Sequence, residues 1–192
     1  MNPVSRFLRP VALAAALGFG LMGTAAAAEY TALDTQASTL AFGYSQMNVK
    51  MDGSFADIKA TEFSFDPAKP EAAKVVLEVS LAGIDAGYDE ANEELKKDEW
   101  LATPTHPLAT FESGKVESLG DGKYQVTGAL TIKGNTREVT VPFTFKEEGT
   151  TGVFEGRFTF QRADFGVGEG QWKDFSIVAN DIEIRFKVVA TS

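Results

Sequence analysis

The chain of 192 residues contains no cysteine and only one histidine. Without cysteine it has no disulfide bonds, thiolate metal sites or cysteine nucleophiles. The one histidine, His106, lies in a loop between Thr105 and Pro107, and alone it cannot build a histidine metal site. The acidic residues between 85 and 99 are typical of a solvated helix face, and no nucleophile lies near them in the sequence. We therefore expect no metal site, no catalytic residues and no required cofactor.

Long hydrophobic runs are also absent, except near the start of the chain. Arg6 and Arg9 precede an apolar stretch over residues 11–22, and an alanine-rich segment ends at Ala28. This stretch is too short to span a bilayer comfortably, and the alanines resemble a cleavage site. The pattern predicts a cleaved signal peptide over residues 1–28, a single mature domain over residues 29–192, and export across a membrane.

Basic residues are few compared with acidic ones. Removing Arg6 and Arg9 lowers the Lys+Arg count from 18 to 16 against 27 Asp+Glu, which gives the mature chain a formal charge of −11. An acidic protein is a poor partner for nucleic acid and for an anionic membrane surface. The sequence thus predicts no nucleic-acid partner.

Aromatic residues are plentiful and spread along the chain. Of its 15 phenylalanines, all but Phe7 and Phe19 lie after residue 28. Many of them stand in short runs that alternate apolar and polar residues, the pattern of strands with one buried face. These runs cover residues 40–44, 55–65, 75–82, 110–116, 124–132, 139–145, 154–160 and 182–188. We expect an all-β fold, an antiparallel up-and-down β-barrel of about eight strands.

One segment breaks this period of two. Residues 86–101 are rich in Glu, Lys, Asn and Ala, and Ala91, Leu95 and Leu101 could share one helical face. Pro104 and Pro107 prevent a helix from continuing further. The segment predicts one short helix or an irregular lid over the barrel.

Strand parity identifies an inward-facing apolar set. Each of these residues alone is more often ordinary core packing, but a barrel of this size can leave room for one ligand. Trp100 and Leu101 close the lid segment and are candidates for a contact with the ligand. The predicted lining is Leu40, Phe42, Tyr44, Phe63, Phe65, Trp100, Leu101, Val126, Leu130, Phe143, Phe158, Phe160, Ile184 and Phe186.

Three further residues are candidates for the mouth of the barrel. Arg162 follows Phe158 and Phe160 at even spacing, so parity places its guanidinium on the inner face. A buried arginine must be paired or meet an anion. The favoured interpretation is an ion pair with Asp164, and the alternative is contact with a phosphate or quinone oxygen of a ligand. Trp172 combines an apolar body with a polar tip, which suits a cavity entrance.

A set of short motifs resembles the YceI-like family in order and spacing over about residues 30–190. They are Tyr30-x3-Asp34, Gly53-Ser54-Phe55, Phe65-Asp66-Pro67, Ile84-Asp85-Ala86-Gly87, Glu94-Leu95, Trp100, Pro107-x-Ala109-x-Phe111-x-Ser113, Gly128-x-Leu130-Thr131-Ile132-Lys133-Gly134-x-Thr136 and Arg162-x-Asp164-Phe165-Gly166. No motif is specific alone. The resemblance rests on their succession.

The resemblance implies an elongated, lipocalin-like barrel that encloses a long-chain lipid. The ligand would be a polyprenyl compound, an isoprenoid quinone or a fatty-acid derivative, and the protein a periplasmic carrier or store. Some relatives occur beside or fused to cytochrome b561-type membrane proteins, so the alternative is an accessory subunit that presents quinone to such a partner. A homodimer is also common among proteins of this kind.

Overall fold

The computed structural model of the protein describes residues 28–192. The predicted signal peptide falls on residues that, apart from Ala28, lie outside this part of the chain, and its cleavage stays a prediction. None of the helices in residues 28–192 has the length and apolar character needed to cross a bilayer.

The described residues form one antiparallel sheet and short helical segments. The strands are β1 (Ala32–Gln46), β2 (Val49–Phe55), β3 (Ile58–Ser64), β4 (Lys74–Ser80), β5 (Ile84–Asp85), β6 (Leu108–Gly120), β7 (Lys123–Ile132), β8 (Asn135–Glu148), β9 (Thr151–Gln161) and β10 (Asp181–Thr191). The helical segments are α1 (Asp89–Leu95) and the 3-10 turns η1 (Pro70–Ala72), η2 (Leu81–Gly83), η3 (Arg162–Phe165) and η4 (Gly170–Lys173).

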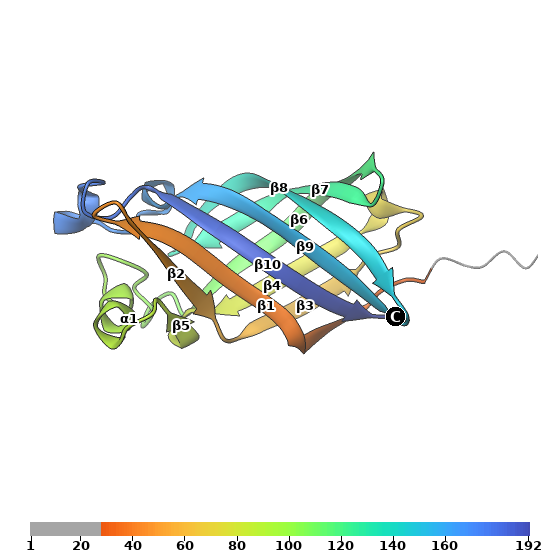
Figure 1. Ribbon diagram of the computed structural model, residues 1–192, viewed down its shortest axis with the longest axis horizontal. Helices are drawn as coiled ribbons and strands as arrows, with labels where there is room; N and C mark the ends of the chain where they lie inside the picture. The colour runs from red at the N-terminus through yellow and green to blue at the C-terminus, as the bar shows by residue number, and fades with distance from the viewer. Residues whose placement is uncertain (1–27) are drawn as a thin grey trace, which may run out of the picture.

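The sheet curls into an elongated barrel (Figure 1). Its strand order is β3-β4-β6-β7-β8-β9-β10-β1-β2-β5, and neighbouring strands are antiparallel. A bridge between Tyr30 and Phe65 joins the chain just before β1 to the chain just after β3, with N···O distances of 2.9 and 3.0 Å. In Figure 1, α1, β5 and the β1–β2 turn lie at one end of the barrel, and the C-terminus lies at the other.

The predicted all-β barrel is confirmed, but it has ten strands instead of eight. The additional strands are β2 and the two-residue β5. The dipeptide Asp52-Gly53 is typical of a turn and predicts one between residues 44 and 55, but this prediction is wrong, because both residues lie inside β2. The chain turns instead at Met47 and Asn48, whose φ angles are 49° and 64°.

Gly53 serves close packing between strands. It pairs with Phe42 across β1 and β2, and the phenyl ring lies over the glycine. A Cβ at Gly53 would stand 2.2 Å from Phe42 Cζ and 2.5 Å from the Asp85 carbonyl oxygen. Aromatic rings that cover strand glycines in this way help to fix strand register.

Replacing Gly53 with alanine is expected to destabilise the barrel by about 1–3 kcal/mol, because the methyl group must displace a buried ring or backbone. Gly43→Ala is the matched control on the partner strand, where the nearest atom to a new Cβ is Asp52 Oδ1 at 3.6 Å. Urea unfolding of both variants measures the difference. Equal midpoints would contradict the packing role of Gly53.

The lid segment contains less helix than the sequence suggested. α1 covers only Asp89–Leu95, and Trp100 and Leu101 follow it in a series of turns, where both are buried. Ala91, Leu95 and Leu101 nevertheless all face the barrel interior, since each lines its cavity. The segment thus covers one end of the barrel.

Candidate functional site

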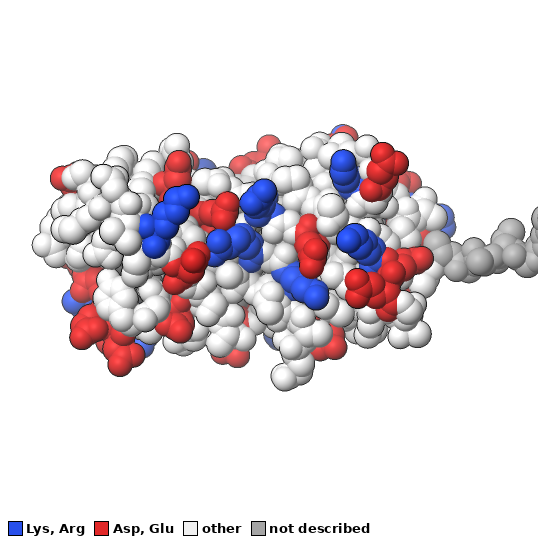
Figure 2. Space-filling model, viewed as in Figure 1, with Lys and Arg blue, Asp and Glu red and all other residues white. Residues whose placement is uncertain are grey.

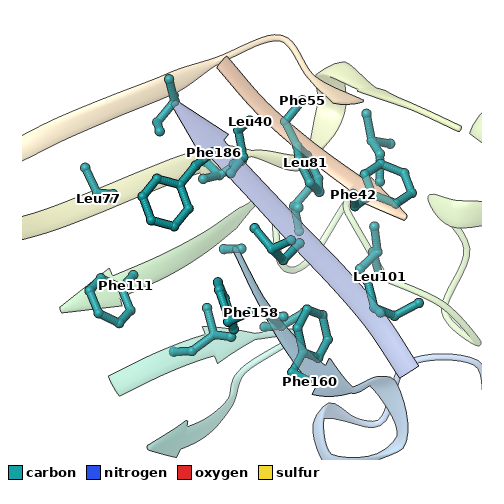
Figure 3. Close-up of a pocket in the computed structure, with 18 of the residues that line it drawn as sticks. Leu40, Phe42, Phe55, Leu77, Leu81, Leu101, Phe111, Phe158, Phe160 and Phe186 are labelled. Carbon is teal, nitrogen blue, oxygen red and sulfur yellow. The ribbon is translucent and has the colours of Figure 1, made fainter. Parts of the chain in front are cut away.

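The barrel encloses a cavity of about 510 Å³. Its wall consists almost entirely of aliphatic and aromatic side chains from β1–β10 and the lid segment. Figure 3 shows side chains such as Leu40, Leu77, Phe111 and Phe158 directed into this space from different strands. A cavity of this size and lining is typical of a site for one apolar molecule.

Every residue predicted from strand parity to line the cavity lies on its wall. Their role in binding stays a prediction. Sequence reasoning did not assign a further group to the cavity, which includes Phe55, Val75, Leu77, Val79, Phe111 and Phe154. The alternation of Val75, Leu77 and Val79 was a usable signal for β4.

One end of the cavity is closed by interlocked rings, here called the aromatic plug. Neighbouring ring centroids lie 4.9–6.4 Å apart, mostly in edge-to-face or tilted arrangements. The plug consists of Tyr30, Phe65, Tyr124, Phe143, Phe145 and Phe154. Burial raises the pKa of Tyr30, whose hydroxyl donates to Glu147 Oε1 at 3.1 Å. The plug lies at the barrel end opposite α1.

The other end of the cavity reaches the protein surface beside α1. Its lining there includes Gln46, Tyr88 and Glu90, and the last two are exposed. This end is the mouth. At its polar side chains a ligand headgroup could meet several hydrogen-bonding groups and solvent together.

Hydrogen bonds hold the lid segment over the mouth. The Tyr44 hydroxyl donates to the Ala86 carbonyl oxygen at 3.0 Å, and the Tyr88 hydroxyl donates to Gln46 Oε1 at 3.1 Å. Burial is the larger cause that raises the pKa of Tyr44, and the neighbouring Tyr88 raises it further. The Tyr44 hydroxyl therefore remains a donor at neutral pH. These bonds connect the lid to β1.

A third bond connects the lid to the loop after β9. Trp172 Nε1 donates to Glu94 Oε1 at 3.1 Å. A hydrogen bond from Lys97 is the main reason that the pKa of Glu94 is lowered, and the bond from Trp172 acts in the same direction. The carboxylate that accepts from Trp172 is therefore charged at neutral pH.

Arg162 lies beside the mouth with its side chain only 1% exposed. All five of its N–H groups donate to backbone carbonyl oxygens of the loop over residues 167–179. The acceptors belong to Val167, Gly168, Trp172, Val178 and Ala179, at distances of 2.7–3.1 Å. Burial lowers the pKa of the guanidinium, but arginine still keeps its charge.

The expected ion pair between Arg162 and Asp164 is wrong. Asp164 is exposed and does not line the cavity, and within residues 28–192 no carboxylate lies within 4 Å of the guanidinium. The physical reason is that β9 ends at Gln161, so strand parity no longer applies where η3 begins. The alternative was a bond from Arg162 to a ligand headgroup. Arg162 and Trp172 both line the cavity, but every N–H group of Arg162 already donates to a backbone carbonyl oxygen, so none is free for a headgroup.

Gly168 allows the loop to wrap around the guanidinium. Its φ is +80°, and a Cβ there would lie only 1.8 Å from Arg162 Nη1. The glycines between 166 and 170, which superficially resemble a phosphate-binding loop, therefore surround a side chain of the same protein. Trp100 also packs on Arg162, with the guanidinium carbon 5.3 Å from the ring centroid.

Trp100 carries an unusual polar atom. Its Nε1 is the one buried side-chain nitrogen or oxygen, among the described residues, that has no hydrogen-bond partner. The ring lines the cavity and lies 5.4 Å from the ring of Trp172. A buried donor without a partner is costly, and it is one of the few groups near the mouth that a ligand oxygen could satisfy.

Residues 28–192 contain no cluster of His, Asp or Glu suited to a metal ion.

Comparisons with known proteins agree with this architecture. The chain matches the family model of the YceI-like domain over residues 31–190. It is 31% identical over 191 residues to a UPF0312 protein of Azotobacter vinelandii, covering 94% of this chain and 97% of that protein. The crystal structure of Burkholderia cenocepacia BcnA is similar with a TM-score of 0.80 and 39% identity, over 83% of this chain and 99% of that chain.

A second solved structure is similar in fold alone. It is a polyisoprenoid binding domain from Saccharophagus degradans, implicated in plant cell wall breakdown. Its TM-score is 0.67 at 16% identity, over 86% of this chain and 99% of that domain.

Proposed function

This chain belongs to the YceI-like family, and from that premise we propose that it carries or stores one long-chain amphiphilic lipid inside its barrel. The proposed ligand is a polyprenyl compound, an isoprenoid quinone or a fatty-acid derivative. The proposed location is the periplasm, in line with the amino-terminal sequence pattern.

The observation that carries the proposal is the apolar cavity. An apolar chain gains about 0.8 kcal/mol for each CH₂ group that it removes from water. A tube lined by side chains such as Leu40, Leu77 and Phe158 offers little else to a ligand. The polyisoprenoid-binding relative from Saccharophagus degradans, which has the same fold, supports a ligand of this kind.

Polar groups at the mouth favour a ligand with an oxygen-containing headgroup. Trp100 Nε1 lacks a partner, and Gln46, Tyr88 and Glu90 line the outer part of the cavity. Arg162 is not included, because the backbone takes all of its N–H groups. We propose a binding protein without a cofactor, since the relatives include a binding domain and the cavity-lining residues at the mouth, within residues 28–192, include no evident nucleophile.

An accessory role in a cytochrome b561-type membrane redox system is the second candidate. The apolar side chains exposed around the mouth favour it, because they suit contact with a membrane-bound partner. A homodimer is a further proposal that rests on the family resemblance.

Native mass spectrometry of the protein from its own periplasm, followed by lipid extraction, tests the main proposal. We expect a single class of isoprenoid or quinone lipid at close to one molecule per barrel. A barrel without lipid, even after incubation with these lipids in detergent, would show that the phenylalanines serve only as core.

A further inference from the structure

Four large apolar side chains are exposed around the mouth, and they are here called the rim. The rim consists of Met47 in the β1–β2 turn, Val49 at the start of β2, Tyr88 before α1, and Phe175 in the loop before β10. Met47 is 68% exposed and Val49 is 58% exposed. The other large apolar residues that are exposed within residues 28–192 are Leu108 and Leu119.

Hydrogen bonds bring the rim segments together. The Met47 amide donates to the Ile177 carbonyl oxygen at 2.8 Å, which ties the β1–β2 turn to the loop that contains Phe175. Tyr88 donates to Gln46 next to the same turn. Because Gln46 and Tyr88 also line the cavity, the rim continues directly from the cavity wall.

The backbone at Met47 shows that this position is not optimised for folding. The turn is a two-residue hairpin with positive φ at both central residues, a conformation that favours asparagine or glycine. A methionine at a φ of 49° is strained there, and its side chain projects into solvent. An exposed apolar residue at a strained turn points to a contact outside the protein.

We propose that the rim docks the mouth of the barrel onto the surface of an electrically neutral lipid bilayer. The proposal rests on the proposed function, because a carried lipid must leave and enter a membrane. The rim offers four apolar side chains, a small apolar patch compared with the apolar core of a stable protein interface. Inserting a few apolar side chains is enough for reversible contact with a bilayer.

Charge determines which bilayer suits the rim. Residues 85–99, which contain α1, carry seven acidic and two basic side chains. In Figure 2 uncharged atoms cover the upper part of the left-hand end of the molecule, and acidic side chains gather below them. Anionic lipids would be repelled by these carboxylates, so zwitterionic lipid is the expected surface.

Vesicle flotation of the full mature protein tests the proposal. We expect binding to phosphatidylcholine vesicles and weaker binding when phosphatidylglycerol replaces half of the lipid. The double variant Met47→Ser/Val49→Ser should bind phosphatidylcholine about tenfold more weakly, since two inserted side chains are lost. Leu119→Ser is the matched control, an equally exposed residue of β6 outside the rim, and its binding should not change.

Met47→Asn separates docking from stability. Asparagine suits the positive φ, so the thermal unfolding midpoint should stay or rise while vesicle binding falls. No binding by the unaltered protein, or equal loss in the Leu119→Ser control, would overturn the proposal. Rim variants that retain vesicle binding but lose contact with a membrane protein would overturn it in favour of a protein partner.

The lipid content of the same samples keeps the two proposals apart. A protein that contains lipid but does not float with vesicles contradicts docking alone. A protein that floats but never contains lipid contradicts the carrier function alone.

Discussion

Replacing Arg162 with methionine is expected to destabilise the protein by about 3–5 kcal/mol. The substitution leaves five carbonyl oxygens of residues 167–179 without their donors, three of them in buried bonds and two in partly buried ones, and each lost bond costs free energy. The loop that they form should then become sensitive to limited proteolysis. Urea unfolding and mass-spectrometric mapping of the cleavage sites measure both effects.

Arg185→Met is the matched control for this variant. Arg185 is partly exposed and forms ion pairs with Asp52 and Glu183 on the outside of the barrel. Exposed ion pairs contribute about 0–1 kcal/mol. Similar losses of stability in the two variants would contradict the role assigned to Arg162. Folded Arg162→Met protein should keep its lipid, and a specific loss of lipid would revive a headgroup contact.

Replacing Leu77 with tryptophan is expected to reduce bound lipid about tenfold or more, because the indole would occupy the middle of a cavity sized for one ligand. Leu77 points inward from β4 (Figure 3). The fold should be retained, since the larger ring enters space that protein atoms do not fill. Lipid extraction and thermal unfolding of the same sample measure occupancy and stability.

The outcome separates a cavity from an ordinary core. If the interior were solid, the extra atoms would strain it and destabilise the protein by about 1–3 kcal/mol. Leu119→Trp adds the same bulk on the outer surface and should change neither lipid content nor stability. Unchanged lipid in Leu77→Trp would mean that the ligand lies elsewhere.

Strand parity predicted the barrel and its apolar wall from sequence because the inside of a curled sheet is a single face. Two expectations from the sequence failed for identifiable reasons. Residues 49–55 look like a turn at Asp52-Gly53, and only the ring of Phe42 across the sheet explains the glycine. Parity placed Arg162 on the inner face correctly, but β9 ends at Gln161, so parity did not report the direction of Asp164.

The partners of Arg162 were also beyond prediction from residue types. A carboxylate partner can be recognised in a sequence as Asp or Glu, whereas every residue has a backbone carbonyl group, so residue type does not identify a carbonyl partner. The glycines at 166, 168 and 170 were the available signal, and all three have positive φ. They indicate a tightly wrapped loop without indicating what it surrounds.

The aromatic plug makes the barrel a blind tube, and a blind tube imposes direction and length on a chain-like guest. Such a guest can enter only tail first, so its headgroup always stays at the mouth. The distance from Phe65 to the lid then sets the length of tail that fits inside the barrel. Shorter tails leave apolar wall uncovered, and longer tails push their last units out past Tyr88. For a lipid carrier this geometry selects cargo by tail length, separately from any contact that the headgroup makes at the mouth.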